Sequence, residues 1–462
     1  MAKKKELDKT ELFESMPIPK AVMNLSIPMV LSSLVMVVYN LTDTYFVGML
    51  NDAVQTAAVT IAGTLLLAFN AINNLFGVGG SSMMSRALGS KDYDTVKRSS
   101  SFSFWCCFVF ALLYSVLYTV FQNPVLKVLG ATSETLAATK AYCIWTVTLG
   151  AIPAILNVVL AYFIRSEGAS STAGVGTILG CIVNMVLDPF FILPWGLNMG
   201  AGGAGLATLI GNVCAIVYFL VYLFRKRKTT FVCINPKMAI PTGSIAKGVF
   251  AVGIPAAIQN LLNVTGMTIL NNFAASYGAS VVSAVGIAYK VYMVPMQICM
   301  GTSQGIMPLI GYNYASGNIN RMKKGMLFTY KVAIIFLVII AAIFFGFSSP
   351  IISMFIKDST IISYGSFYLK CYALSITFLC VDFLGVGCCQ AIGKGGLTLI
   401  FAVLRKIVLE IPLLILLNHL IGAKGLCMAQ GIAEFILSIA SVIILVNLVR
   451  KLEKNHSISK EQ

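Results

Sequence analysis

The amino-acid sequence predicts an all-α membrane protein with twelve transmembrane helices arranged as two pseudo-symmetric six-helix bundles. The mean hydropathy is +0.87, and only 11% of the 462 residues are charged, whereas about 25% are charged in an ordinary soluble domain. Apolar runs of roughly 20 residues, long enough to cross a bilayer, recur along the chain. These runs do not alternate with polar residues, which excludes a β-barrel, so each span is expected to be a helix that pairs its own backbone groups.

The two halves of the chain repeat one another at a distance of 227 residues. Ser26-Ile27-Pro28 is echoed by Gly253-Ile254-Pro255, and both prolines are expected to open long apolar helices. In the same register, Asp52–Ala57 aligns with Ala279–Ala284. We therefore predict two related bundles and interpret Pro28 as a hinge at which the first helix bends.

Polar breaks and helix-interrupting residues divide the first half into six spans. Asn51 and Asp52 end the first span, and a basic loop follows the second. Pro153 lies inside the fourth span, Pro194 follows the fifth, and a glycine-rich turn opens the sixth. The predicted spans are about 24–49, 55–83, 100–121, 136–162, 169–192 and 203–224.

The longest polar connection joins the two halves and sets the predicted domains. The spans of the second half are about 247–277, 280–310, 328–348, 361–388, 396–418 and 423–448. The chain then divides into a cytoplasmic N-tail (1–23), an N-terminal lobe (24–224), a cytoplasmic basic linker (225–246), a C-terminal lobe (247–448) and a cytoplasmic C-tail (449–462).

Positive charge lies almost entirely on one side of the predicted spans. Loops and tails on the side of the termini hold 24 Lys and Arg, and the opposite loops hold only three, Lys127, Lys357 and Lys424. Because cationic loops stay in the cytoplasm, we expect both termini there, in a multi-pass protein of the plasma or inner cell membrane. The net charge of +16 is thus explained by topology, and no nucleic acid is expected as a partner.

Two acids inside spans are candidates for ion coupling. Asp43 shares a helical face with Tyr39 in the first span, and Asp188 shares a face with Asn184 in the fifth. Both acids are expected in the outer part of the bilayer, where intramembrane carboxylates mark ion pathways. We predict a site that takes up H⁺, or Na⁺ at Asp43, Asn184 and Asp188. The alternative is that either acid pairs structurally with Lys140.

Other polar side chains are candidates for the wall of a substrate cavity, because methionine adapts to varied ligands and amides supply hydrogen bonds. They are Met36 and Asn40 in the first span, Asn260, Asn263, Met267 and Asn271 on one face of the seventh, and Glu434 in the twelfth. Glu434 stands alone among apolar neighbours, either as a cavity acid for a cationic substrate or as a structural group. Lys406 and Glu410 are four residues apart and are expected to form a structural pair.

Enzymatic and metal chemistry find no support in the sequence. The histidines are His419 and His456, at a loop edge and in the tail. Gly200–Gly205 matches G-x-G-x-x-G, but it follows a membrane span and not the strand that a dinucleotide site requires, so we interpret it as close helix packing. The 12 cysteines form no C-x-x-C pair and are expected to be free thiols. We expect no cofactor beyond the coupling ion and no metal beyond a bound Na⁺.

Several local motifs resemble those of the multidrug and toxic compound extrusion (MATE) family over nearly the whole chain. Ile27-Pro28 with Tyr39-Asn-Leu-Thr-Asp43 resembles the first helix of that family, and Asn184-Met-Val-Leu-Asp188-Pro189 with Gly202-Gly203-Ala-Gly205-Leu-Ala-Thr208 resembles the fifth and sixth. Gln390-Ala-Ile-Gly-Lys394 looks like the segment after the tenth. The resemblance implies a V-shaped pair of six-helix lobes that exchanges organic cations for H⁺ or Na⁺.

Within that family the chain is most similar to the DinF-like branch. The resemblance implies coupling through the N-terminal lobe, at Tyr39, Asp43, Asn184 and Asp188. It implies Tyr142 and Thr208 as two further positions of the same site. The NorM-like branch carries an acid in the seventh span, and this chain has none there.

The sequence therefore predicts a secondary active multidrug efflux antiporter, not an enzyme. It is expected to export amphipathic organic cations in exchange for H⁺ or Na⁺ by alternating access, as a monomer in contact with membrane lipids. The alternatives are a lipid-linked precursor flippase of the same superfamily and, from another class, an intramembrane enzyme or channel.

Overall fold

The computed structural model describes residues 10–240 and 242–461, and every regular element in them is a helix. The first half contains α2 (Ile18–Gly48), α3 (Ala53–Asn73), η1 (Asn74–Val78), α4 (Gly79–Gly89), α5 (Tyr93–Val128), α6 (Leu136–Cys143), η2 (Ile144–Thr148), α7 (Ala151–Ser166), α8 (Ser170–Ile192) and α9 (Ala201–Arg225). Side chains cap several of these helices; for example, Asp52 accepts a hydrogen bond of 2.8 Å from the Val54 N–H at the start of α3.

The second half follows a short 3₁₀ turn, η3 (Pro236–Met238), in the connection between the lobes. Its elements are α10 (Gly243–Ala275), α11 (Ala279–Ala315), α12 (Ile319–Gly346), α13 (Ser348–Ser353), α14 (Ser359–Ala391), α15 (Gly395–Val403), η4 (Leu404–Glu410), α16 (Ile411–Ile421), η5 (Gly422–Lys424) and α17 (Gly425–Glu461). Three of the elements inside the apolar spans, η1, η2 and η4, are π-helical turns.

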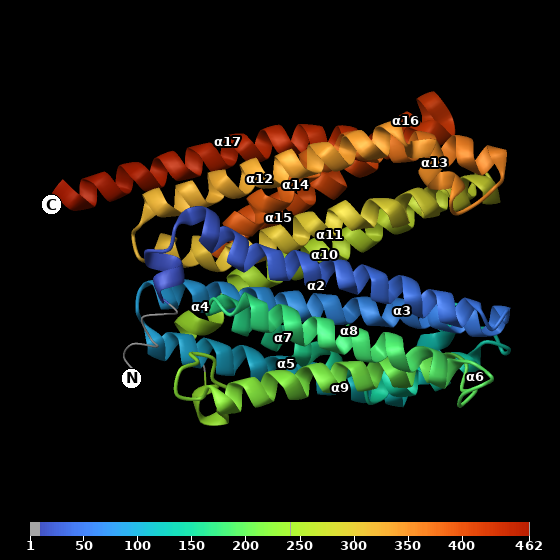
Figure 1. The fold of residues 1–462 in the computed structure, drawn as a ribbon, viewed down its shortest axis with the longest axis horizontal. Helices are drawn as coiled ribbons and strands as arrows, with labels where there is room; N and C mark the ends of the chain where they lie inside the picture. The colour runs from blue at the N-terminus through green and yellow to red at the C-terminus, as the bar shows by residue number, and fades with distance from the viewer. Residues whose placement is uncertain (1–9, 241, 462) are drawn as a thin grey trace.

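The number of membrane-spanning segments follows from how two irregular stretches are counted. Ten helices of the described chain are long and apolar enough to cross a membrane, and counting the bent pair Leu136–Thr148 and Ala151–Ser166 as one span gives eleven. The last of the ten, Gly395–Lys454, contains a turn at Gly422, where φ is +66°. After this turn α17 runs back along α16 (Figure 1). Counted as two spans, this stretch gives the twelve that the sequence predicts.

The prediction that two prolines open their helices is wrong. α2 begins at Ile18 and α10 begins at Gly243, so Pro28 and Pro255 both lie inside continuous helices. A proline within a membrane helix removes one backbone hydrogen bond, but packing against neighbouring helices allows the helix to continue. The equivalent place of the two prolines still reflects the repeat.

The two halves form two bundles, and the first helix of each bundle contacts the other bundle (Figure 1). Within the bundles, α2 packs against α8 and α10 packs against α15. Between the bundles, α2 packs against α11, and α10 packs against α3, η1 and α4. In Figure 1 the bundles meet near the end that carries both termini and separate toward the other end. The first helix of each repeat thus helps to hold the lobes together, as does the packing of α4 against α11.

Glycines allow the backbones to approach closely at this junction. A Cβ atom at Gly305 of α11 would lie 2.7 Å from Cα of Ser26 on α2. A side chain at Gly79 of α4 would collide with the backbone carbonyl of Val249 on α10. Small residues at such crossings let membrane helices gain dispersion contacts that a bulkier side chain would prevent.

A short segment before α2, residues 10–16, closes the end of the molecule that carries the termini; we call it the N-terminal clasp. Phe13 of the clasp is only 1% exposed and stacks on Tyr312 of α11, with ring centroids 4.8 Å apart. The Tyr312 hydroxyl donates to Glu14 at 2.6 Å. The guanidinium of Arg321 donates to the carbonyl oxygens of Phe13 and Met16, each at 2.5 Å. These contacts attach the clasp to the C-terminal lobe.

The clasp also contacts the N-terminal lobe. A Cβ atom at Gly168, between α7 and α8, would lie 3.1 Å from the ring of Phe13, and the backbone there has φ of +88°. Lys91, between α4 and α5, lies 3.7 Å from Glu14. The clasp therefore contacts both lobes on one face of the molecule.

Truncating the buried ring of the clasp should lower the stability of the whole protein. We expect Phe13→Ala to cost about 3–5 kcal/mol, because large-to-small changes at fully buried aromatic positions leave a cavity. A thermal unfolding curve of the purified protein in detergent measures the effect. Phe347→Ala is the control, since Phe347 is 60% exposed, and equal melting temperatures for the two variants would contradict the packing described here.

Candidate functional site

Two carboxylates lie together inside the N-terminal lobe without a cationic partner. Asp188, on α8, is fully buried, and neither of its carboxylate oxygens has a hydrogen-bond partner in the described chain. Oδ1 of Asp43, on α2, is also buried and without a partner. The two acids are close enough for their charges to interact, and neither forms an ion pair with Lys140. This pair can accept a proton or a small cation.

A polar network of three other side chains lies near the acids. Thr208 of α9 accepts a hydrogen bond of 3.2 Å from the Asn184 amide, and the hydroxyls of Thr208 and Tyr39 lie 3.5 Å apart. Tyr142, at the end of α6, is 3% exposed and lies within electrostatic reach of Tyr39 and both acids. The structure thus brings together the six residues predicted as the coupling site, from α2, α6, α8 and α9.

A cavity of about 290 Å³ opens beside this network within the N-terminal lobe. Met36 and Asn40 line it, together with Tyr39, Asn184 and Thr208 of the network. The remaining lining residues are Leu66, Phe69, Asn70, Asn73, Thr146, Ala154, Asn157, Val158, Thr177, Gly180, Cys181, Gly211, Asn212 and Ala215. None of the described residues that line this cavity is charged, so its polar surface consists mainly of amides and hydroxyls.

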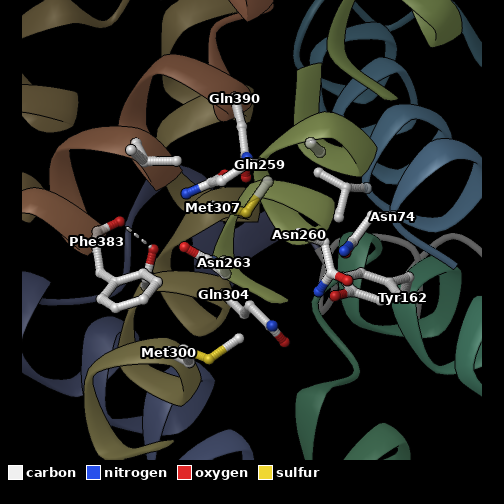
Figure 2. Close-up of a pocket in the computed structure, with 14 residues that line it drawn as sticks. Asn74, Tyr162, Gln259, Asn260, Asn263, Met300, Gln304, Met307, Phe383 and Gln390 are labelled. Carbon is white, nitrogen blue, oxygen red and sulfur yellow. Dashed lines mark hydrogen bonds between the residues drawn. The ribbon is translucent and has the colours of Figure 1, made fainter. Parts of the chain in front are cut away.

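A second, smaller cavity of about 70 Å³ lies between the two lobes. Asn260 and Asn263 of α10 line it, as Figure 2 shows, with Asn74, Tyr162, Gln259, Met300, Gln304, Met307, Phe383 and Gln390 also labelled around it. The dashed line at Phe383 marks the hydrogen bond of 2.7 Å that the Ser303 hydroxyl donates to the Phe383 carbonyl oxygen. This inter-lobe cavity is likewise lined by amides and methionines without a charged side chain.

One family model, MatE, matches the chain twice, at residues 28–190 and at residues 255–416. The chain belongs to the MatE family. The two matches begin at Pro28 and Pro255, which confirms the repeat of 227 residues predicted from the sequence.

Several curated relatives and solved structures are similar to this MatE chain over nearly its full length. The multidrug export protein MepA of Staphylococcus aureus (strain MRSA252) is 33% identical over 437 residues, which cover 94% of each protein. MepA of Staphylococcus saprophyticus is 33% identical over 435 residues, also 94% of each. The names of these relatives are those of transport proteins, in agreement with the prediction that the chain is not an enzyme.

The solved structures share the two-bundle fold. An outward-facing multidrug resistance MATE family transporter of the MOP superfamily has a TM-score of 0.90 at 23% identity, with 96% of this chain and 98% of that chain covered. A MOP superfamily transporter from Pyrococcus furiosus, for which reverse polarity of the binding pocket suggests a different function, has a TM-score of 0.89 at 22% identity, with 96% and 98% covered.

In the C-terminal lobe of this MatE protein the intramembrane acids are paired with cations. Arg405 lies 2.5 Å from Glu434 and 3.8 Å from Asp382, and all three are buried. Lys406 lies 2.6 Å from Glu410, which confirms the predicted structural pair. Arg405, Lys406 and Glu410 all belong to the π-helical turn η4.

The expectation that Glu434 stands alone is therefore wrong. The twelfth span contains no cation at helical spacing from Glu434. Its partner, Arg405, comes from the preceding span. Met267 packs beside the hydrophobic core and Asn271 is exposed, and neither lines the two cavities described above. Glu434 also lies outside the lining of both cavities.

Sequence reasoning did not single out four asparagines that line the larger cavity. They are Asn70, Asn73, Asn157 and Asn212. Each is an amide inside an otherwise apolar span, and polar residues within membrane helices usually face the bundle interior or a wet cavity. η1 directly follows Asn73, and π-helical turns occur frequently at functional sites. In the sequence, three amides in the five residues from Asn70 to Asn74 are the pattern that could have indicated a polar cavity here.

Breaking the buried ion pair of the C-terminal lobe should destabilise the fold. We expect Glu434→Gln to cost about 3–5 kcal/mol, because it leaves the Arg405 guanidinium buried with one distant carboxylate. Asp94→Asn, which removes an exposed pair with Arg98, should cost less than about 1 kcal/mol. Thermal unfolding in detergent compares the two variants. A Glu434→Gln protein as stable as the wild type would contradict a structural role for the pair.

Proposed function

We propose that this MatE-family protein is a secondary antiporter that exports amphipathic organic cations in exchange for H⁺ or Na⁺. The observation that carries the proposal is the pair of Asp188, which is buried, and Asp43, whose Oδ1 is buried; neither forms an ion pair within the described residues, and the pair lies next to a cavity. Charged carboxylates in a low-dielectric interior require a proton or a cation. A site that must be occupied by an ion from solution is suited to ion coupling.

The location of the pair links ion binding to helix packing. Asp43 lies on α2, and α2 packs against both α8 of its own lobe and α11 of the other lobe. Tyr39 on the same helix reaches Thr208, and both line the larger cavity. When the ion leaves, the two carboxylates repel one another, and α2 and α8 must readjust. We infer that this readjustment alters the cavity and the junction between the lobes, with Pro28 in α2 as the hinge.

The polar lining of both cavities supports cations over anionic lipids as substrates. Neither cavity is lined by a Lys or Arg, whereas a phosphate group is normally bound by such side chains. The relatives named as multidrug export proteins support small-molecule export. We further propose that the protein is a monomer in the cell membrane. The charge imbalance between loops supports a location of both termini in the cytoplasm.

Neutralising either acid should abolish ion-driven export. We expect Asp43→Asn and Asp188→Asn each to lower gradient-driven export of a fluorescent organic cation from proteoliposomes at least tenfold, since neither amide can exchange a proton and neither carries the charge that attracts Na⁺. Imposing H⁺ and Na⁺ gradients separately identifies the ion.

Asp52→Asn is the matched control for this experiment. Asp52 is an exposed acid that caps α3, and asparagine caps helices equally well, so export should stay at the wild-type rate. Circular dichroism and thermal unfolding establish that the site variants are folded. Wild-type export by either site variant would refute the coupling role.

A further inference from the structure

An apolar groove of about 390 Å³ lies between α12 and α17 and shares no lining residue with the two cavities described above. The two helices each pack more extensively against α14 than against each other, so a groove remains between them. Met326 and Leu445 are buried in it, whereas Leu327, Val442 and Val446 are exposed. We call it the α12–α17 groove.

One end of the α12–α17 groove is basic. Lys323, near the start of α12, and Arg450, in the last part of α17, line this end together with Glu453. Lys323 lies 2.7 Å from Glu453, whereas Arg450 forms no ion pair within the described residues. The guanidinium of Arg450 is therefore left without a carboxylate, and it favours an anionic partner such as a phosphate.

The length of the groove matches one leaflet of a bilayer. Its lining residues on α17 run from Val442 to Glu453, a rise of about 16 Å at about 1.5 Å per residue. One leaflet is half of a hydrocarbon core about 30 Å thick, or about 15 Å. Lys323 and Arg450 lie just outside the predicted spans 328–348 and 423–448, at the end of the molecule that carries the C-terminus (Figure 1). In the proposed topology this end lies at the cytoplasmic surface.

The corresponding place in the N-terminal lobe is covered by the chain itself. α5 and α9 are the third and sixth spans of that lobe, as α12 and α17 are of the other. The connection after α9 turns back onto α5, where the Ser101 hydroxyl donates to the Cys233 carbonyl at 2.9 Å. The Trp105 indole donates to the Ile234 carbonyl at 3.0 Å. α17 instead continues as a helix to Glu461, so within the described residues no returning segment covers the α12–α17 groove.

We propose that the α12–α17 groove binds an anionic phospholipid of the cytoplasmic leaflet. One acyl chain lies along the apolar residues of the groove, and the phosphate lies at Arg450 and Lys323. A guanidinium binds two phosphate oxygens at once, and the acyl chain covers apolar surface that a free phosphate would leave exposed. The groove is separate from the two acids and from both cavities, so lipid binding here does not depend on what the protein exports.

The test is native mass spectrometry of the purified full-length protein in detergent. The protein is titrated with palmitoyl-oleoyl phosphatidylglycerol or with phosphatidylcholine of the same two chains. Both probes carry a phosphate, but the choline group supplies its own cation. We expect the wild type to bind phosphatidylglycerol at least about fivefold more tightly, and Arg450→Gln to lower that affinity about fivefold, the effect of one basic side chain near a membrane surface.

Lys451→Gln is the matched control for Arg450→Gln. Lys451 is the next residue of α17, is exposed and does not line the groove. Its loss removes the same charge from the same end of the helix, but the affinity should stay within about twofold of the wild type, because an exposed charge is screened by salt.

Val446→Trp tests the apolar part of the site. The larger side chain fills the groove and should lower the affinity for phosphatidylglycerol at least about fivefold, because the acyl chain loses its apolar contacts. Thermal unfolding in detergent establishes that each variant is folded before its affinity is measured.

Four results would overturn the proposal. Equal affinity of the wild type for the two lipids, or equal losses in Arg450→Gln and Lys451→Gln, would mean that only general surface charge attracts the lipid. Unchanged affinity in Val446→Trp, or displacement of the lipid by inorganic phosphate at the same concentration, would mean that the acyl chain does not occupy the groove.

Discussion

A carboxylate buried in a membrane protein requires a proton or a cation, and the two lobes meet this requirement in different ways. In the C-terminal lobe the counter-charges belong to the protein itself, because Arg405 and Lys406 lie against Glu434 and Glu410. In the N-terminal lobe Asp43 and Asp188 have no such partner among the residues that the structure describes. The lobes share a fold and a sequence repeat, so the difference arises from a few side chains. In the C-terminal lobe the buried acids contact cationic side chains of the protein, whereas under the proposed function the acids of the N-terminal lobe take their counter-ion from solution.

Much of the fold could be predicted because hydropathy and charge act over long stretches. Apolar runs located the membrane-crossing parts of the helices, although helices such as α12 and α17 extend well beyond the predicted spans. The repeat anchored on Pro28 and Pro255 is the one that the family model matches. The acids Asp43 and Asp188 were also predictable as neighbours, because each is a charged residue in an apolar helix at a similar distance from the same end of the lobe. Hydropathy and charge can be interpreted without knowing which face of each helix points toward its neighbours.

The features that could not be predicted depend on which faces of two helices contact one another. Periodicity assigned Glu434 to an apolar helix, but it could not show that η4 turns Arg405 toward α17. A π-helical turn adds a residue to the helical repeat, so side chains after it are displaced from the expected face. The same reasoning explains why Asn73 and Asn157 were missed, since an amide in a helix becomes part of a cavity only through its neighbours.

The N-terminal clasp has a consequence for how the chain is assembled. Phe13 is made first, but the side chain that covers it, Tyr312, is about 300 residues away in sequence. While the first lobe enters the membrane, the clasp segment exposes a phenylalanine and carbonyl groups that later bind Arg321. The clasp can therefore bind Tyr312 and Arg321 only after the second lobe has been inserted. A newly made chain with a clasp that is still accessible to protease or label is one whose two halves have not yet joined.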